Sequence, residues 1–246
     1  RRLTGAVPRG VAPEIQFPAL RCGGNLDVNG LSFRVGFRLR FGASPDGRVD
    51  SEIPLPIEAG QGFEIAMRTA GGHRVFKQFW RSQVEAYLDT PRTAGTTNSQ
   101  AAVTLTLRGA DGAVKGTAAG TADPSGRFDL DIVDAAGAPV MIVAGDTLTA
   151  VGGGDSAAVP IDALSFDWSP GGPVSGLAPA GRDLRLTLRL TDGRRLSLPR
   201  TADANGRWAF TADEVPVRGG WTLDDVTAVR AALLTAGGHS IINQSS

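Results

Sequence analysis

The sequence predicts an all-β protein made of tandem β-sandwiches with Greek-key-type topology. Three observations predict this fold class: short stretches that alternate apolar and polar residues, Asp-Gly and Gly-Arg turns between them, and the recurrence of both at intervals of about 80 residues. Glycine (33 residues) and proline (15) are frequent enough to separate many short strands. An interval of about 80 residues is too long for one solenoid turn and fits a whole sandwich of seven strands, somewhat trimmed.

The clearest pair of predicted strands is 103–108 and 184–189. Both stretches alternate apolar and polar residues, which is typical of a strand with one buried face. Each leads into an Asp-Gly dipeptide, at 111–112 and at 192–193, which tolerates the positive φ of a tight hairpin. The two stretches begin 81 residues apart, so they indicate equivalent hairpins in two repeats.

A second pair of equivalent segments is Thr121–Phe128 and Thr201–Trp208. Each begins with Thr-Ala-Asp and ends with Gly-Arg followed by an aromatic residue. The polar turn leads into a strand, and we expect the aromatic side chain to anchor the core of its module.

The N-terminal third carries a weaker third copy. Apolar residues alternate with arginine or glycine from Phe33 to Phe41, and Gly47-Arg48 matches the later Gly-Arg turns. The pentapeptide Thr-Ala-Gly-Gly-His occurs at 69–73 and again at 235–239.

These landmarks divide the chain into four predicted parts, each module having a core of its own. The boundaries fall in the Pro- and Gly-containing segments 90–99 and 169–173. The parts are an N-terminal arm (1–25), a divergent module (26–92) and two better matched modules (93–172 and 173–246). The arm lies outside the repeat and would be either an extended segment or an added strand.

Two stretches fit more than one kind of element. Residues 82–88 fit either one helical turn or a strand. In 222–236, Thr222 and Asp225 have the spacing of a capping box and apolar residues recur at helical intervals, whereas the repeat predicts a strand. We favour the strand for 222–236.

A longer motif combines these features: strand, Asp-Gly turn, strand, Thr-Ala-Asp-x-x-Gly-Arg-Phe/Trp, then Ala-Gly-Asp-Thr-Leu-Thr-Ala at 144–150. It resembles bacterial immunoglobulin-like surface modules of the carboxypeptidase-regulatory-like and invasin types. The resemblance covers 103–246 and is poor for 1–100. It implies tandem immunoglobulin-like sandwiches and a place in stalks, adhesins, filaments, surface layers or appendages of secreted enzymes. Because the motifs are turn chemistry, they imply fold more than function.

The composition argues against several functional classes. The formal net charge is zero, with 25 basic and 25 acidic residues, which argues against a general nucleic-acid binder. No apolar run approaches the roughly 20 residues that span a bilayer. The single cysteine, Cys22, excludes an intrachain disulfide. The chain begins at Arg1 and shows no signal peptide, so we expect it to be processed or excised from a longer protein.

No set of residues predicts catalysis. His73 and His239 are equivalent positions of the repeated pentapeptide, so we interpret both as turn residues. A thiolate at Cys22 would be favoured by Arg21, but a lone, partly buried thiol is the preferred interpretation. No nucleophile elbow, phosphate-binding loop or His-Glu-x-x-His motif is present. We therefore predict no catalytic residue and no cofactor.

A calcium site is the one metal site that the sequence suggests. Asp123, Asp129 and Asp131 cluster around the second Gly-Arg turn and would offer oxygen ligands. The third copy does not repeat this set, and the alternative is that Asp129 and Asp131 face water on an alternating strand.

A ligand platform is the other candidate site. Sugars stack on exposed aromatic rings, and Trp80, Trp168 and Trp221 are not explained by the core pattern. The alternative is that these indoles are buried in cores or at module junctions.

Taken together, the sequence predicts a non-catalytic structural protein of the bacterial cell surface or the extracellular space. It would be a subunit or segment of a stalk, filament or surface layer, and would associate with copies of itself through edge strands and the N-terminal arm. The alternative function is a glycan- or host-surface-binding accessory module of a secreted protein.

Overall fold

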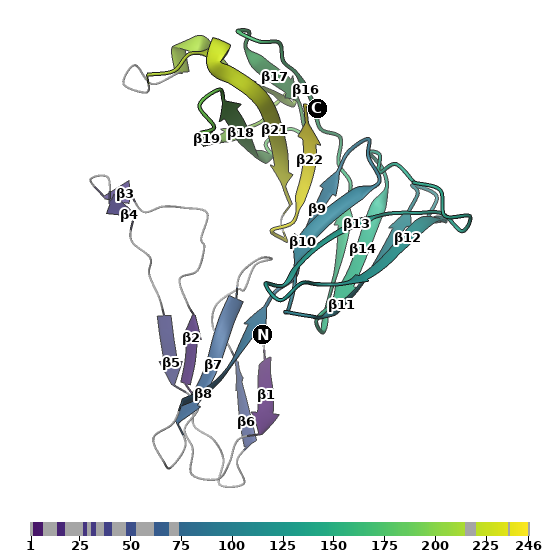
Figure 1. The fold of residues 1–246 in the computed structure, drawn as a ribbon, viewed down its shortest axis with the longest axis vertical. Coiled ribbons are helices and arrows are strands. Elements are labelled where there is room, and N and C mark those ends of the chain that lie inside the picture. Colours follow the sequence, from purple (N-terminus) through teal and green to yellow (C-terminus); the bar gives the residue numbers. More distant parts are fainter. Residues whose placement is uncertain are drawn as a thin grey trace. The chain divides into compact units, whose positions relative to one another are not determined.

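The computed structural model describes residues 81–214, 220–235 and 237–245 with their side chains, and the backbone of eight strands before residue 81 (Figure 1). The chain divides into two compact units, 1–82 and 83–246. Both are built from strands arranged in several sheets, which confirms the all-β prediction. Helical structure in the described ranges is confined to two single 3-10 turns, η1 (Ala212–Glu214) and η2 (Leu223–Asp225).

The described residues of the first unit form eight strands in three antiparallel sheets. Four strands form a sheet in the order β5-β2-β7-β8, β1 pairs with β6, and β3 pairs with β4. The strands are β1 (Arg2–Ala6), β2 (Glu14–Phe17), β3 (Asp27–Val28), β4 (Leu31–Ser32), β5 (Phe37–Arg40), β6 (Arg48–Glu52), β7 (Gly62–Arg68) and β8 (Arg74–Trp80).

The predicted N-terminal arm, 1–25, therefore contains strands of this unit. β1 pairs with β6 over five residue pairs, and β2 lies between β5 and β7. Of the two alternatives for this segment, an extended arm and an added strand, the structure shows strands. The short hairpin β3–β4, inserted between β2 and β5, shifts both strands away from the 80-residue interval.

The second unit contains two sets of seven strands. The second strand set is β9 (Gln83–Tyr87), β10 (Arg92–Thr96), β11 (Ala102–Arg108), β12 (Val114–Thr121), β13 (Arg127–Asp131), β14 (Thr147–Gly152) and β15 (Asp155–Pro160). The third strand set is β16 (Ser165–Asp167), β17 (Val174–Leu177), β18 (Asp183–Leu190), β19 (Arg195–Thr201), β20 (Arg207–Phe210), β21 (Val226–Leu234) and β22 (Ser240–Gln244).

The strand order is the same in both sets. In the second set the strands neighbour one another as β13-β10-β9 and β12-β11-β14-β15, and in the third as β20-β17-β16 and β19-β18-β21-β22. The sheets β5-β2-β7-β8 and β1-β6 of the first unit follow the same order as β12-β11-β14-β15 and β10-β13. Among the described strands, the first unit therefore shares this order except that it has no counterpart of β9 and β16 and has the additional pair β3–β4.

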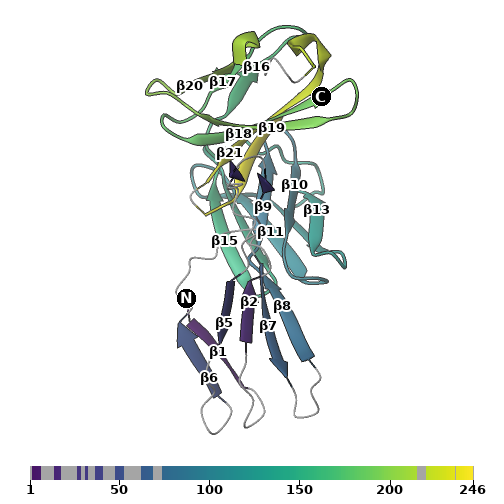
Figure 2. The same cartoon turned by 90° about the vertical axis from the view of Figure 1, so that its left-hand side faces the viewer.

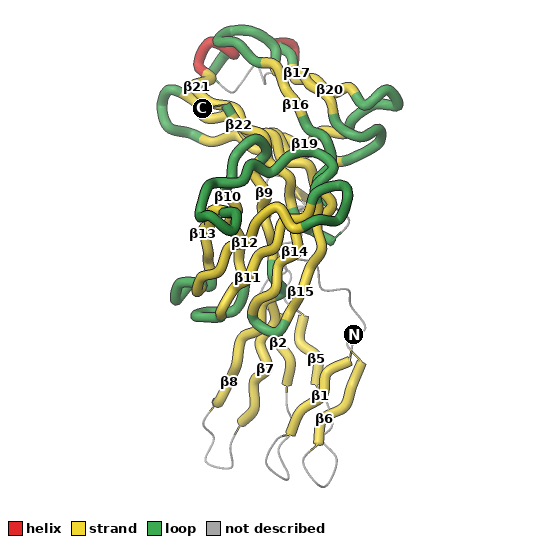
Figure 3. The backbone as a smooth tube through the Cα atoms, turned by 90° about the vertical axis from the view of Figure 1, so that its right-hand side faces the viewer, coloured by secondary structure: helices red, strands yellow, loops and turns green. Residues whose placement is uncertain are grey.

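The two sets of the second unit share one sheet of seven strands. β22 pairs in parallel with β9, which gives the order β13-β10-β9-β22-β21-β18-β19. Figures 1 and 3 show β9 beside β22, and Figure 2 shows β16 and β17 across from β18 and β21. Ala86 and Ile241 are register partners in this sheet and belong to one buried cluster that runs through both sets. The prediction of a separate core for each module is wrong here, because the pairing of two edge strands joins the interiors.

A glycine and an aromatic ring pack in the same way in both sets. Gly95 lies opposite Val84 and beneath the ring of Phe128, and a side chain added there would overlap with that ring. In the third set Gly176 takes the same place beneath Trp208. Both aromatic side chains are buried, which confirms them as core anchors.

The Thr-Ala-Asp-x-x-Gly-Arg segments form the same turn twice. The Asp123 carboxylate accepts hydrogen bonds from the backbone N–H groups of Ser125 and Arg127, at 2.8 and 2.9 Å. Asp203 does the same for Asn205 and Arg207, both at 2.8 Å. This is an Asx-type turn, in which the carboxylate of a short side chain accepts the backbone N–H groups that a carbonyl would otherwise accept.

Several elements differ from the sequence prediction or resolve its alternatives. The segment 90–99, predicted as a linker, contains β10, and 169–173 connects β16 to β17 inside the third set. β10 was unrecognisable because it contains mostly small and polar residues. Within 82–88, Gln83–Tyr87 form strand β9. Within 222–236, η2 is followed by β21, so the favoured strand is found there.

Among the described residues, no helix has the length and apolarity needed to cross a lipid bilayer.

Candidate functional site

The feature of the second unit with the most specific chemistry is the contact between β9 and β22, here called the joint. Ser240, Ile241 and Ile242 lie opposite Glu85, Ala86 and Tyr87 in parallel register. The Leu88 N–H extends the pairing by donating to the Ile242 carbonyl at 2.8 Å. Parallel pairing normally joins strands linked by a crossover helix, whereas these strands are about 155 residues apart in sequence.

His239 binds Val84, the residue of β9 just before the paired positions of the joint. Its Nδ1 accepts a hydrogen bond from the Val84 backbone N–H at 3.2 Å, and both residues are buried. The tight turn that presents the ring closes when the Gly238 N–H donates to the Thr235 carbonyl, and Gly238 has φ +82°. His239 therefore lies in a turn, and its ring also satisfies a backbone donor of the neighbouring strand set.

A row of polar side chains crosses the outer face of the seven-stranded sheet. Arg230 of β21 forms an ion pair with Glu85 of β9 at 3.0 Å. The Tyr87 hydroxyl donates to Glu85 at 3.1 Å, and Arg92 stacks its guanidinium 4.8 Å from the centre of the Tyr87 ring. Arg92 then binds Asp129 of β13 through two hydrogen bonds, of 2.6 and 3.0 Å. This row ties four strands from both sets together.

The partners in the row change the acidity of two of its members. Burial raises the pKa of the Tyr87 phenol, and the neighbouring Glu85 carboxylate raises it further. The two hydrogen bonds from Arg92 lower the pKa of Asp129 below its ordinary value. The two shifts favour the neutral phenol of Tyr87 and the charged carboxylate of Asp129, the forms that take part in the row.

The connection between the two sets is also fixed. Asn243 of β22 donates to the Leu164 carbonyl at 2.9 Å. Arg182 donates to the Leu234 carbonyl at 3.1 Å and forms an ion pair with Asp162 at 3.5 Å. The chain between β15 and β16 is thus attached to the third set at both ends.

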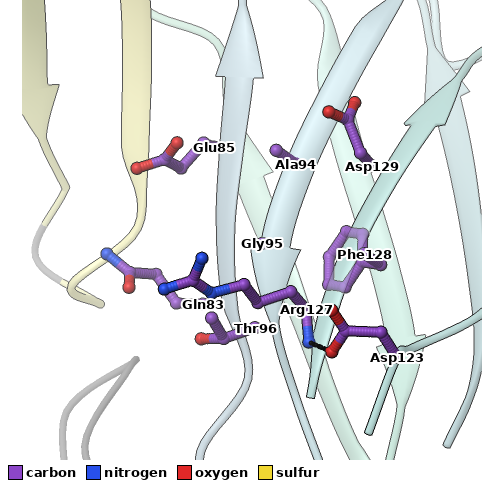
Figure 4. Close-up of a pocket in the computed structure, with 9 residues that line it drawn as sticks. All are labelled: Gln83, Glu85, Ala94, Gly95, Thr96, Asp123, Arg127, Phe128 and Asp129. Carbon is purple, nitrogen blue, oxygen red and sulfur yellow. Dashed lines mark hydrogen bonds between the residues drawn. The ribbon is translucent and has the colours of Figure 1, made fainter. Parts of the chain in front are cut away.

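An open hollow of about 480 Å³ lies on the outer face beside the joint (Figure 4). Its floor is β10, whose outward residues Ala94 and Thr96 are small, and its walls are longer side chains of β9 and β13. Figure 4 shows the Arg127 side chain extending over Thr96 toward Gln83. A hollow of about 510 Å³ occupies the same place in the third set, over β17.

The carboxylates around the first hollow already have partners. Glu85 pairs with Arg230, and Asp129 pairs with Arg92. Asp123 accepts its own turn N–H groups, which lower its pKa together with the hydroxyl of Ser125. The hollow recurs because the glycine and aromatic packing recurs, and its geometry does not assemble a nucleophile with a base.

The three predicted calcium ligands have different surroundings. Asp123 is occupied by its turn, Asp129 forms the ion pair with Arg92, and Asp131 is exposed at the end of β13. In the described part of the chain, no three His, Cys, Asp or Glu side chains converge as metal ligands would. Calcium binding remains an untested prediction.

The predicted tryptophan platforms are mostly covered. Trp221 is buried and stacks on Phe210, with ring centres 6.2 Å apart. Trp168 is half-buried against the core, and its indole N–H, like that of Trp208, has no hydrogen-bond partner among the described residues. Trp80 lies in β8, whose side chains are outside the described residues, as are His73 and Cys22.

The sequence analysis did not identify the joint. Glu85, Tyr87 and Arg230 were not singled out, because nothing local marks two strands that meet across about 155 residues. One signal was present: Ala231 to Leu234 and Ile241-Ile242 are consecutive apolar residues rather than alternating ones. Such runs are typical of strands covered on both faces.

Comparison with known proteins gives no family. No family profile matches the chain, and no curated protein matches it. Three solved structures show limited similarity. One is the tetra-tandem repeat in the extending region of a large adhesion protein, with 16% identity over 99% of this chain and 69% of that one, and a TM-score of 0.25.

The other two are longer than this chain. Native E. coli α2-macroglobulin has 13% identity over 99% of this chain and 19% of its own, with a TM-score of 0.23. Bacteroides ovatus SGBP-B of the mixed-linkage glucan utilization locus, in complex with a mixed-linkage heptasaccharide, has 12% identity over 98% and 60%, with a TM-score of 0.19. This chain spans less than two thirds of either. TM-scores of this size do not establish a shared fold.

The hydrogen bond at His239 predicts a difference between two substitutions. His239→Ala leaves the buried Val84 N–H without its acceptor, and we expect the free energy of unfolding to fall by about 1–3 kcal/mol. His239→Asn places an amide oxygen near the position of Nδ1 and should retain most of the stability. Urea unfolding of the full chain measures both. Equal losses in the two variants would contradict the role of Nδ1.

The ion pair of Asp129 predicts a pH dependence. Because its folded pKa is lowered, the pair stabilises the fold above the unfolded pKa of about 3.9, and this contribution is lost as the pH falls through the folded pKa. At pH 7 Asp129→Asn should cost about 0.2–1 kcal/mol, since the pair is largely exposed. The difference from wild type should vanish in acid. Asp213→Asn, at an exposed position on η1, is the control. A pH-independent cost at Asp129 would reject the pair.

Proposed function

We propose that this chain is a non-catalytic structural segment of a bacterial cell-surface stalk, filament or surface layer, built from tandem immunoglobulin-like sandwiches. The observation that carries the proposal is the joint. Two consecutive strand sets are held by parallel strand pairing, and not by a linker alone. A protein that spans distance or bears load needs its modules to resist bending and separation at their connections.

The joint resists separation through several kinds of contact. Pulling the sets apart would break the β9–β22 pairing and the Val84–His239 hydrogen bond. It would also expose Ile241 and Ile242, which are fully buried. Apolar burial of this kind contributes roughly 1.5–3 kcal/mol for each large aliphatic side chain.

The polar groups of the joint support a structural role over a chemical one. The charged side chains of the row pair with one another across the sheet, so they stabilise the contact. A surface location is supported by the resemblance of the repeated Thr-Ala-Asp-x-x-Gly-Arg segments to bacterial surface modules. Glycan binding has no specific support from Trp168 or Trp221, since one is half-covered and the other buried.

The first prediction concerns coupling between the two sets. In the wild-type full chain, amides of β11 and β18 should exchange hydrogen with free energies of opening within about 1 kcal/mol of each other, because the sets open together. Ile242→Lys places a charge in the joint and should separate the two values. Hydrogen exchange with mass spectrometry measures them.

The matched control is Ala158→Lys, an exposed position on β15, the strand equivalent to β22. It should leave the coupling unchanged. Wild-type values that already differ by several kcal/mol would show that the sets unfold independently and would remove the basis of the proposal.

The second prediction concerns location. In the organism that produces it, the chain should be cleaved when intact cells are treated with an external protease, and a cytoplasmic marker enzyme should survive. Protection of the chain until the cells are lysed would reject the surface role.

A further inference from the structure

β16 occupies the place in the third set that β9 occupies in the second. Phe166 lies opposite Gly176 as Val84 lies opposite Gly95, so Asp167 corresponds to Glu85. The outer edge of β9 is covered by β22, whereas β16 ends its sheet. An edge strand presents unpaired backbone groups that another strand can bind.

The element that covers β9 is the hairpin β21–β22, and a second hairpin of the chain matches it. β7–β8 has the same register. Arg68 pairs with Arg74 next to the turn, as Leu234 pairs with Ser240, and the next two pairs follow in step in both hairpins. Both hairpins join their strands through the sequence Thr-Ala-Gly-Gly-His.

The third hairpin of this kind is different. β14–β15 closes at the pair Gly152 and Asp155 through two glycines, and lacks the pentapeptide. Of the two hairpins with the pentapeptide, β21–β22 is paired with β9, while β8 ends its sheet in the order β5-β2-β7-β8.

We propose that β8 of a second copy of this chain pairs in parallel with β16, and so repeats the joint between molecules. The proposal rests on the proposed structural function and names its partner. By equivalence with the joint, the register places Arg74 of one copy opposite Asp167 of the other, and Val75 opposite Trp168.

The residues at this edge fit a partner. Asp167 is exposed, and the neighbouring strand β17 carries Leu177, which is 54% exposed although it is a large aliphatic residue. In the joint, Arg230 of β21 supplies the positive charge that pairs with Glu85. The equivalent position of β7 is Glu64, and the positive charge opposite Asp167 would come from Arg74 on β8 itself.

The new pairing is shorter than the joint. Pro170 stands where Leu88 donates its N–H to the Ile242 carbonyl, and proline has no N–H. The contact between copies therefore lacks this last hydrogen bond and should be weaker than the contact within one chain. Because β8 and β16 are different surfaces, the contact is head-to-tail, and repeated contacts of this kind build a filament unless their rotation closes a ring.

Charge reversal tests the proposed register. Full-length chains are examined by sedimentation velocity over a range of concentrations at low salt. The mass of the wild type should rise with concentration. Asp167→Arg and Arg74→Asp each place like charges opposite one another and should weaken association roughly tenfold.

Mixing the two variants is the decisive measurement. Each junction between unlike chains then has one acid opposite one base, so association should return to the wild-type level. This restoration also shows that both variants fold. Asp213→Arg, an exposed position on η1 with the same charge change, is the control and should associate as the wild type does.

Two outcomes would overturn the inference. One is a wild type that stays monomeric at every concentration, in which case β16 accepts no second copy. The other is association that neither reversal weakens, which would place the contact elsewhere. Either outcome leaves the proposed function unaffected if hydrogen exchange still shows that β11 and β18 open together. The proposed function is rejected separately, if intact cells protect the chain from external protease, whether or not the chain associates.

Discussion

The structure of the second unit depends on the pairing of two strands at the edges of its sheets. Every open sheet ends in strands whose backbone donors and acceptors face outward, and burying such groups without partners is costly. Here two edges are placed against each other, β9 from one strand set and β22 from the next. The seven-stranded sheet, the continuous interior and the polar row on the outer face all follow from that pairing.

The two sets that this pairing joins share a local geometry. Turn chemistry supplies it: Asp123 and Asp203 close the same turn, and the glycines opposite β9 and β16 let an aromatic ring pack against the backbone. Glycine is required there because any side chain would occupy the space of the ring. The same few local interactions therefore build each set, and the joint adds only contacts at the seam.

Much of the fold was predictable because it is encoded locally. Alternation identified β11 and β18, and the Asp-Gly turns placed the hairpins β11–β12 and β18–β19. The Gly-Arg turns instead connect strands of different sheets, and the aromatic residues after them proved to be buried. β10 was missed because Arg92 to Thr96 contains no large apolar residue. Its burial is determined by neighbouring strands, so no pattern within the segment reveals it.

The site was less predictable than the fold. His239 was correctly placed in a turn, but its bond to Val84 depends on a strand far away in sequence. The joint could be suspected only from the consecutive apolar residues of β21 and β22, which indicate a strand covered on both faces. Residues such as Glu85 and Arg230 are ordinary surface charges until the sheet brings them together.

The order of the strands along the polypeptide also constrains how the protein is made. A ribosome synthesises about 5–20 residues per second, so β9 emerges several seconds before β22. Until then the nascent second set exposes the edge that the hairpin β21–β22 will cover. During that interval the edge is open to wrong partners on other chains. Folding of the joint must therefore wait until β22 has been synthesised, and any factor that shields the emerging polypeptide would act on β9.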